Sequence, residues 1–159
     1  LFHGNVFSRN NDCIAEFGHL TYQENGRLCS CKRKGCYSQY ASMKALRTNI
    51  ARRKNYSHLQ NEDVLSLLKQ KDEIALEEFQ KQNEILQKLI GNLANILSPQ
   101  KIILGGSFSY FKKFIPLSFY ENKEHWYNRH SDCKIEITDF GNDLGLLGAA
   151  FQKDYIRRV

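Results

Sequence analysis

Apolar residues recur every three or four positions through the middle of the chain, a pattern typical of helices with one buried face. The longest such stretch runs from about Asp72 to Leu97 and is followed by Ser98-Pro99, where proline ends the helix. We therefore expect a long amphipathic helix. Its predicted buried stripe consists of Ala75, Phe79, Leu86, Leu89, Ile90, Leu93, Ile96 and Leu97.

Three further helices are predicted. One covers residues 38–54, with an apolar face of Tyr40, Met43, Ala45, Leu46 and Ile50. A second begins at Asn61-Glu62-Asp63, which is typical of an N-cap followed by an acidic first turn. It would bury Val64, Leu67 and Leu68. The last begins near Leu144 and carries Leu146, Leu147, Ala149, Ala150 and Phe151.

Strands are predicted around these helices. His19–Tyr22 is a short strand-like piece, Lys101–Leu104 is predicted to be a buried strand closed by Gly105-Gly106, and Lys134–Thr138 alternates between polar and apolar residues. The aromatic-rich stretch Tyr110–Trp126 is expected to be helical in part, interrupted at Pro116. A strand followed by a glycine turn and a helix indicates an α/β fold.

Composition is that of one ordinary globular domain. The chain has 159 residues, of which 42% are hydrophobic and 25% charged. No apolar run is long enough for a membrane span, and the start, Leu1-Phe2-His3-Gly4, has neither the basic nor the apolar part of a signal peptide. We expect a chain that begins within a longer protein. Five cysteines, an odd number, without a secretory signal favour a reducing cytoplasm.

Candidate chemistry is concentrated near the N-terminus. His19, Cys29, Cys31 and Cys36 follow one another with nine, one and four residues between them. Three thiolates and an imidazole are a common tetrahedral zinc set, and Gly35 could bend the chain back toward the metal. A redox pair and inert thiols are the alternatives, although Cys-x-Cys is not the Cys-x-x-Cys redox spacing.

The remaining cysteines, Cys13 and Cys133, fit no motif, and we expect them to be small apolar core residues. The net charge of +6 is spread along the chain, which is compatible with an anionic partner and equally with a solvated surface. The basic run Lys32–Lys34 lies inside the predicted ligand loop. It could offset the charge of three thiolates, or it could be plain surface charge.

Several segments, in order, resemble the ROK family (repressors, open reading frames and sugar kinases). The most specific are Glu16-Phe17-Gly18-His19, Cys29-Ser30-Cys31 and Gly35-Cys36, which together form the metal motif. The likeness extends over nearly the whole chain through segments at residues 1–4, 71–76, 99–106 and 142–150. It implies an actin-like, ribonuclease-H-like α/β fold with two lobes, of which residues 1–159 would be the second, C-terminal lobe with a zinc-binding loop at 16–38.

The resemblance also implies site residues. Glu16 would hydrogen-bond a sugar hydroxyl, and His19 would do the same with one ring nitrogen while it binds zinc with the other. A further sugar-binding Glu is usual at the position of Ser38, and a hydroxyl lacks the two acceptor oxygens of a carboxylate. Ala15 and Lys32 are two other departures, since each stands where a Gly is usual.

For the nucleotide, the resemblance places Gly105 and Gly106 near the adenosine of ATP if the full-length protein is a kinase. A simple strand-ending turn is the alternative. The family's phosphate loop and its catalytic Asn-Asp pair belong to the other lobe. Asn11-Asp12 and Asn142-Asp143 lie in different contexts, so we assign no catalytic residue to this chain.

Three functions follow from these implications. The first is the effector lobe of a sugar-responsive transcriptional regulator. Ser38 favours this function, because a regulator responds to the sugar through its conformation rather than by catalysis and therefore tolerates weaker sugar contacts. The alternative is the C-terminal lobe of an ATP-dependent sugar kinase, of the glucokinase, fructokinase or N-acetyl-hexosamine kinase type. The third is a module that only oligomerises.

The expected partners are a sugar or sugar phosphate and a second copy of the chain in a homodimer or larger oligomer, through Phe108–Trp126 and the long helix. We expect no membrane, and DNA only through a domain absent from this chain.

Overall fold

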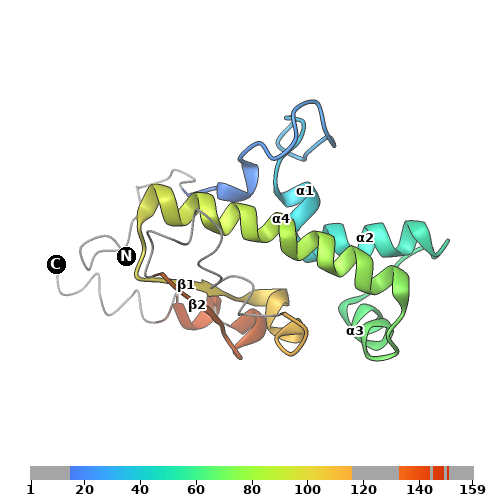
Figure 1. Ribbon diagram of the computed structural model, residues 1–159. Coiled ribbons are helices and arrows are strands. Elements are labelled where there is room, and N and C mark those ends of the chain that lie inside the picture. The colour runs from blue at the N-terminus through green and yellow to red at the C-terminus, as the bar shows by residue number, and fades with distance from the viewer. Residues whose placement is uncertain (1–14, 116–132, 144, 149, 151–159) are drawn as a thin grey trace.

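A single long helix, α4 (Glu73–Leu97), organises the domain. On one side lie α1 (Ser38–Ala41), α2 (Met43–Arg53) and the cysteine-bearing loop, and on the other lie two strands (Figure 1). The helix α3 (Asn61–Lys69) packs near the start of α4. This computed structural model describes residues 15–115, 133–143, 145–148 and 150. Within that part of the chain no helix is long and apolar enough to cross a membrane.

Side-chain caps decide where the helices begin. The predicted single helix over residues 38–54 is wrong, because Ser42 has an extended backbone and its Oγ accepts a hydrogen bond from the Ala45 N–H at 3.1 Å. This N-cap divides the segment into α1 and α2. The N-cap of α3 is Gln60 rather than Asn61, since Asp63 accepts from the Gln60 N–H at 2.7 Å in a capping box.

The buried face of α4 is only partly the predicted stripe. Ala75, Phe79, Leu86 and Ile90 are buried in the main core, but Ile96 and Leu97 are exposed. The expectation for these last two was wrong. Polar residues share the buried face, and they are Glu78, Gln82, Asn83 and Gln87. Gln82 shows how such a residue is accommodated, because its Nε2 donates to the Ala41 carbonyl at 2.6 Å.

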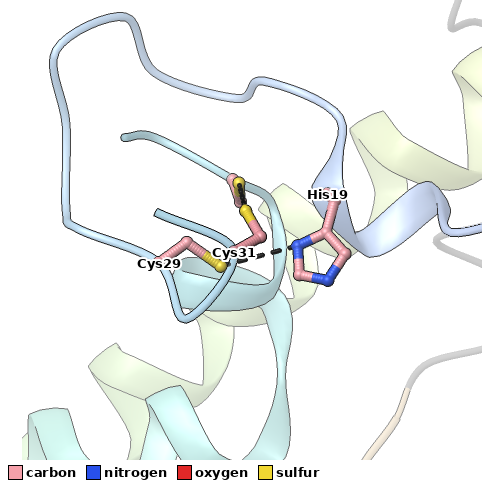
Figure 2. Close-up of side chains that lie close together, drawn as sticks. His19, Cys29 and Cys31 are labelled. Carbon is pink, nitrogen blue, oxygen red and sulfur yellow. Dashed lines mark hydrogen bonds between the residues drawn. The ribbon is translucent and has the colours of Figure 1, made fainter. Parts of the chain in front are cut away.

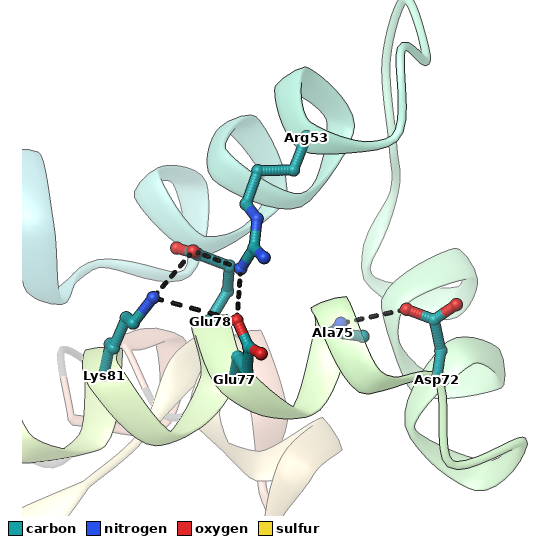
Figure 3. A network of polar contacts seen from close by, with 6 residues as sticks. All are labelled: Arg53, Asp72, Ala75, Glu77, Glu78 and Lys81. Atoms are coloured by element: carbon teal, nitrogen blue, oxygen red, sulfur yellow. Dashed lines mark hydrogen bonds and ion pairs between the residues drawn. The ribbon is translucent and has the colours of Figure 1, made fainter.

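Ion pairs join the C-terminal end of α2 to the start of α4. The Arg53 guanidinium contacts Glu77 at 2.8 Å and Glu78 at 3.0 Å (Figure 3). Its hydrogen bond and charge lower the pKa of Glu77. Lys54 pairs with Asp72, the N-cap of α4, whose other oxygen accepts from the Ala75 N–H. The hydrogen bond from Lys54 lowers the pKa of Asp72.

The two predicted strands pair in parallel. β1 (Lys101–Leu104) runs beside β2 (Lys134–Ile137) with Lys101 opposite Lys134. The alternation predicted for β2 is confirmed, because Ile135 and Ile137 are buried in the core. β1 is not fully buried as expected, since Ile103 is 54% exposed. Helices packed on a parallel strand pair confirm the α/β class.

A 3₁₀ helix, Gly106–Phe111, covers the start of the aromatic segment that was expected to be helical in part. Phe111 is fully buried and its ring lies 5.9 Å from that of Phe79. Residues 116–126 of the predicted segment, which include Pro116 and Trp126, lie outside the described residues. The last predicted helix is present at residues 145–148 and 150, and its leucines, Leu146 and Leu147, are exposed.

Candidate metal centre

The loop that carries the histidine and cysteines is built from short local elements. Phe17–His19 forms a 3₁₀ turn, so the predicted strand at His19–Tyr22 is reduced to one bridge, Thr21 to Cys36. A second bridge joins Leu28 to Lys34. These two antiparallel bridges bring the ends of the cysteine segment together.

Cys29 and Cys31 lie in the tight turn between the paired residues. The Cys29 N–H donates to the Arg33 carbonyl at 2.8 Å, and the Lys32 N–H donates to the Cys29 carbonyl at 2.9 Å. Closing this turn places Lys32 in the left-handed region, with φ +68°. Ala15 also has a positive φ, +61°. Both are positions where the family resemblance led us to expect glycine, and the backbone explains that preference.

The structure brings the four predicted ligands together. The Nδ1 atom of His19 lies 3.5 Å from the Cys29 Sγ, the sulfurs of Cys31 and Cys36 are 3.6 Å apart, and all four ligand atoms lie within 4.8 Å of one another (Figure 2). Ligands at zinc bond lengths in a tetrahedron are separated by roughly 3.5–3.8 Å. The donor set and its spacing therefore fit a tetrahedral metal ion.

Two of the thiols, those of Cys29 and Cys36, differ strongly in acidity. The Cys31 backbone N–H hydrogen-bonds the Cys29 sulfur and lowers the pKa of Cys29 to about 5. Burial, together with the neighbouring sulfurs, raises the pKa of Cys36 to about 11. Without a cation the cluster therefore does not hold three thiolates at neutral pH, and metal binding must release protons from it.

Polar side chains surround the Cys29 sulfur. The Gln39 Nε2 donates to it at 3.4 Å, and the hydroxyls of Ser38 and Ser30 lie at 3.7 and 3.9 Å. Such contacts hold metal ligands in place. The sequence did not reveal the role of Gln39, because its spacing matches no ligand motif. Ser38 was singled out only as a sugar-site position, and the structure places it against the cluster.

The far side of His19 faces a carboxylate. While Nδ1 points into the cluster, Nε2 lies 3.7 Å from Glu16 Oε2. The Glu16 side chain is exposed and that of His19 is one-third exposed. Glu16 and the second nitrogen of His19 thus present adjacent polar atoms that a ligand can reach.

Tyrosine rings attach the loop to the helices. Tyr22 packs against Tyr37 and Tyr40 with ring centroids 5.2 and 5.0 Å apart. The Tyr37 hydroxyl accepts from Asn92 on α4 at 3.2 Å, and the Tyr40 hydroxyl accepts from the backbone N–H of Arg27 at 2.7 Å. The orientation of the cluster is therefore tied to α1 and α4.

The other residues singled out in the sequence are less involved. Lys32–Lys34 are exposed, and Arg33 hydrogen-bonds Thr21 at 3.0 Å. Cys133 is half-buried and lies outside the core cluster, and Cys13 lies outside the described residues. Gly105 is extended, and Gly106, with φ +60°, begins the 3₁₀ helix. Both glycines are remote in sequence from the cysteine loop.

Replacing Gly35 with alanine will destabilise the loop by about 2 kcal/mol or more. Gly35 has φ +82°, and a Cβ there would lie 1.7 Å from the Gln23 carbonyl oxygen. Gly18→Ala is the matched control, because its Cβ would meet only Ser38 Cβ at 3.6 Å. Chemical unfolding of the metal-loaded proteins measures the difference. Equal stabilities of the two variants would contradict the prediction.

Replacing Lys32 with glycine will instead stabilise the loop, by about 1 kcal/mol, because a left-handed residue with a Cβ carries a steric cost. Lys34→Gly removes the same charge from the same run, but Lys34 pairs with Leu28 and has no positive φ. We expect that control to lower the free energy of unfolding. A shift of the same sign in both variants would show that charge, not backbone strain, dominates.

Comparisons with known proteins place this geometry in a family. The model of the ROK family matches residues 1–153. An N-acetylmannosamine kinase from Haemophilus influenzae (strain PittGG) is 30% identical over 134 residues, which cover 84% of this chain and 43% of the kinase. The chain thus spans less than half the length of that relative.

Solved structures show the same fold. A ROK family glucokinase from Streptomyces griseus, in complex with glucose and AMPPNP, aligns with a TM-score of 0.72 and 23% identity, over 87% of this chain and 51% of that one. A ROK family transcriptional regulator, a homologue of the E. coli MLC protein, aligns with a TM-score of 0.62 and 24% identity, over 78% and 34%. The fold is therefore the actin-like, ribonuclease-H-like α/β fold of ROK sugar kinases, and the chain belongs to the ROK family.

Proposed function

We propose that this chain is the zinc-bearing, sugar-binding C-terminal lobe of a ROK sugar kinase. The observation that carries the proposal is the Cys3His cluster with His19 between it and Glu16. The kinase names of the relatives support this function over the regulator that the sequence led us to prefer. The proposed substrate class is a hexose or an N-acetyl-hexosamine.

His19, Cys29, Cys31 and Cys36 would hold the zinc ion, which supplies a fixed tetrahedral anchor for the loop. An anchored Nδ1 leaves Nε2 of His19 to hydrogen-bond a sugar hydroxyl. Glu16, 3.7 Å from that nitrogen, would accept from a neighbouring hydroxyl. Ser38 would contribute a single weaker contact beside them.

In phosphoryl transfer, this lobe would bind and orient the sugar, and Gly105-Gly106 would lie against the adenosine of ATP. Neither glycine of this turn carries a side chain that would block a flat base. The groups that abstract the hydroxyl proton and hold the phosphates would come from the other lobe. Accordingly, the chain alone should bind but not phosphorylate a sugar.

Sugar affinity and turnover of the full-length protein test this function. Calorimetry with N-acetylmannosamine and glucose should show binding that Glu16→Gln weakens about tenfold, the cost of about one charged hydrogen bond. Glu24→Gln is the control, because Glu24 is an exposed carboxylate of the same loop. Failure of the metal-loaded protein to bind either sugar, or equal weakening by both substitutions, would overturn the proposed sugar site. Phosphorylation with ATP then decides whether the protein is a kinase.

A regulator is the second candidate, and two observations favour it. Ser38 stands where a sugar-binding Glu is usual, and a ROK family transcriptional regulator shares the fold. A regulator would bind the same sugars and leave ATP unused. Sugar-dependent binding of operator DNA by the full-length protein, without turnover, would favour this candidate.

We further predict that the protein is a dimer. Large apolar side chains on the strand side of the domain are exposed, among them Ile103, Tyr110, Phe140 and Leu146, and apolar patches of this kind favour association. Two-fold pairing is the commonest arrangement of identical chains. Light scattering across a tenfold range of concentration should give twice the mass of one chain. One chain of these 159 residues has a mass of 18.5 kDa. A constant monomer mass would exclude the dimer.

A further inference from the structure

A groove lies along one face of α2, bordered by Arg27 of the cysteine loop in its smaller part and by residues 56–59 in its larger part. It consists of two adjoining hollows of about 290 and 460 Å³, which share Lys44, Thr48 and Arg52. Ser38, Gln39 and Asn49 line the smaller hollow, and Tyr56 and His58 line the larger. We call this feature the α2 groove. Its size is that of sites for small molecules.

The charge of the α2 groove has one sign. Among the described residues, its lining includes four cationic side chains and no Asp or Glu. The cations are Arg27, Lys44, Arg47 and Arg52. Lys44, Thr48 and Arg52 recur at intervals of four, so they lie on one face of α2. A hollow with charges of one sign concentrates counter-ions.

The other cations of this region are neutralised. Arg53, next to Arg52, turns toward α4 and pairs with Glu77 and Glu78 (Figure 3), and Lys54 pairs with Asp72. Lys44 and Arg52 have no such carboxylate partner among the described residues. The same helix thus carries paired cations on its inner side and unpaired ones along the groove.

Two of the groove's cations are held in position. The Arg27 guanidinium donates to the Gln39 carbonyl at 2.9 Å and lies 4.7 Å over the Tyr40 ring. Arg47 donates to Asn61. Ser42, the N-cap of α2, lines the smaller hollow, where the helix dipole adds positive potential. Fixed guanidiniums and nearby hydroxyls favour the multiple oxygens of a phosphate over chloride.

We propose that the α2 groove binds a small phosphate ester, with Arg27, Lys44 and Arg52 as its main contacts. Two hollows leave room for both the phosphate and the organic part of such a ligand. Ser38 lines the groove and also lies 3.7 Å from the Cys29 sulfur, so an occupied groove adjoins the metal loop. The proposal does not rest on the sugar-binding function.

The test is a nuclear magnetic resonance titration of the full-length, ¹⁵N-labelled protein at constant ionic strength, with inorganic phosphate and then pyrophosphate. We expect saturable shifts at Thr48 and Asn49, and affinity about tenfold lower in Lys44→Gln/Arg52→Gln. Lys69→Gln/Lys113→Gln is the matched control, because it also removes two exposed cations, neither with an ion pair among the described residues. Lys44→Arg/Arg52→Lys should retain binding.

Three outcomes would overturn the proposal. The first is the absence of saturable shifts with either anion. The second is equal weakening in the groove variant and its control, which would indicate general charge attraction. The third is binding of a DNA duplex through these residues without binding of phosphate or pyrophosphate. Because sugar is absent from the titration, none of these results depends on the proposed sugar site.

Discussion

Replacing Cys31 with serine will remove the metal and unfold the loop from residue 16 to residue 37. Apart from the packing of Tyr22 on Tyr37 and Tyr40, the loop is shaped mainly by two isolated bridges and by the cluster of four ligands. Zinc binding to such a cluster contributes about 10–16 kcal/mol. Because the unfolded chain has no such site, this binding free energy stabilises the folded loop. A serine hydroxyl does not ionise at neutral pH and is a poor replacement for a thiolate.

Metal analysis and native mass spectrometry measure the result. The unaltered protein should hold about one zinc per chain, and Cys31→Ser should hold much less. Cys133→Ser is the control, because Cys133 lies outside the cluster and should leave the zinc content unchanged. Proteolysis should cut the loop of the Cys31 variant while α4 stays resistant. A metal-free protein with an ordered loop would refute the site.

The helices and strands could be largely predicted from the sequence because their signals are local. The recurrence of apolar residues every three or four positions predicted α4, and the alternation of polar and apolar residues predicted β2. The single helix predicted over residues 38–54 was wrong for a physical reason. The apolar residues keep their helical spacing across Ser42, but the Ser42 hydroxyl accepts from the Ala45 N–H and starts a new helix there. Polar residues on the buried face of α4 were also missed. Gln82 is buried only because its amide reaches the Ala41 carbonyl, 41 residues away in sequence.

The ligands of the candidate metal site could be named because Cys and His are informative at fixed spacing. The cations of the α2 groove could not be separated from surface charge. Arg52, Arg53 and Lys54 are adjacent in sequence. Arg53 pairs with Glu77 on α4 and Lys54 with Asp72 just before it, whereas Arg52 has no carboxylate partner in the part of the chain that the structure describes. Which cation is paired depends on the packing of distant segments. Composition and spacing therefore left this feature undetermined.

Replacing Ser38 with glutamate will strengthen sugar binding by about tenfold or more. Ser38 is half-buried at the start of α1, and its Cβ lies 3.6 Å from the place of a Cβ on Gly18, the neighbour in sequence of the candidate sugar contact His19. A carboxylate there adds two acceptor oxygens, and a hydrogen bond to a charged group contributes about 1.5–3 kcal/mol. A difference of about 1.4 kcal/mol is tenfold in affinity.

The control must add the same charge at the same distance from the cluster. Ser30→Glu does so, because the Ser30 hydroxyl lies 3.9 Å from the Cys29 sulfur and that of Ser38 lies 3.7 Å away. Calorimetry with glucose and N-acetylmannosamine should show tighter binding for Ser38→Glu alone, with zinc content equal in both variants. Equal affinities would show that position 38 does not contact the sugar. Weaker binding by Ser38→Glu, with zinc retained, would place the sugar elsewhere on this lobe, because a carboxylate with two acceptors would then meet no hydroxyl donor.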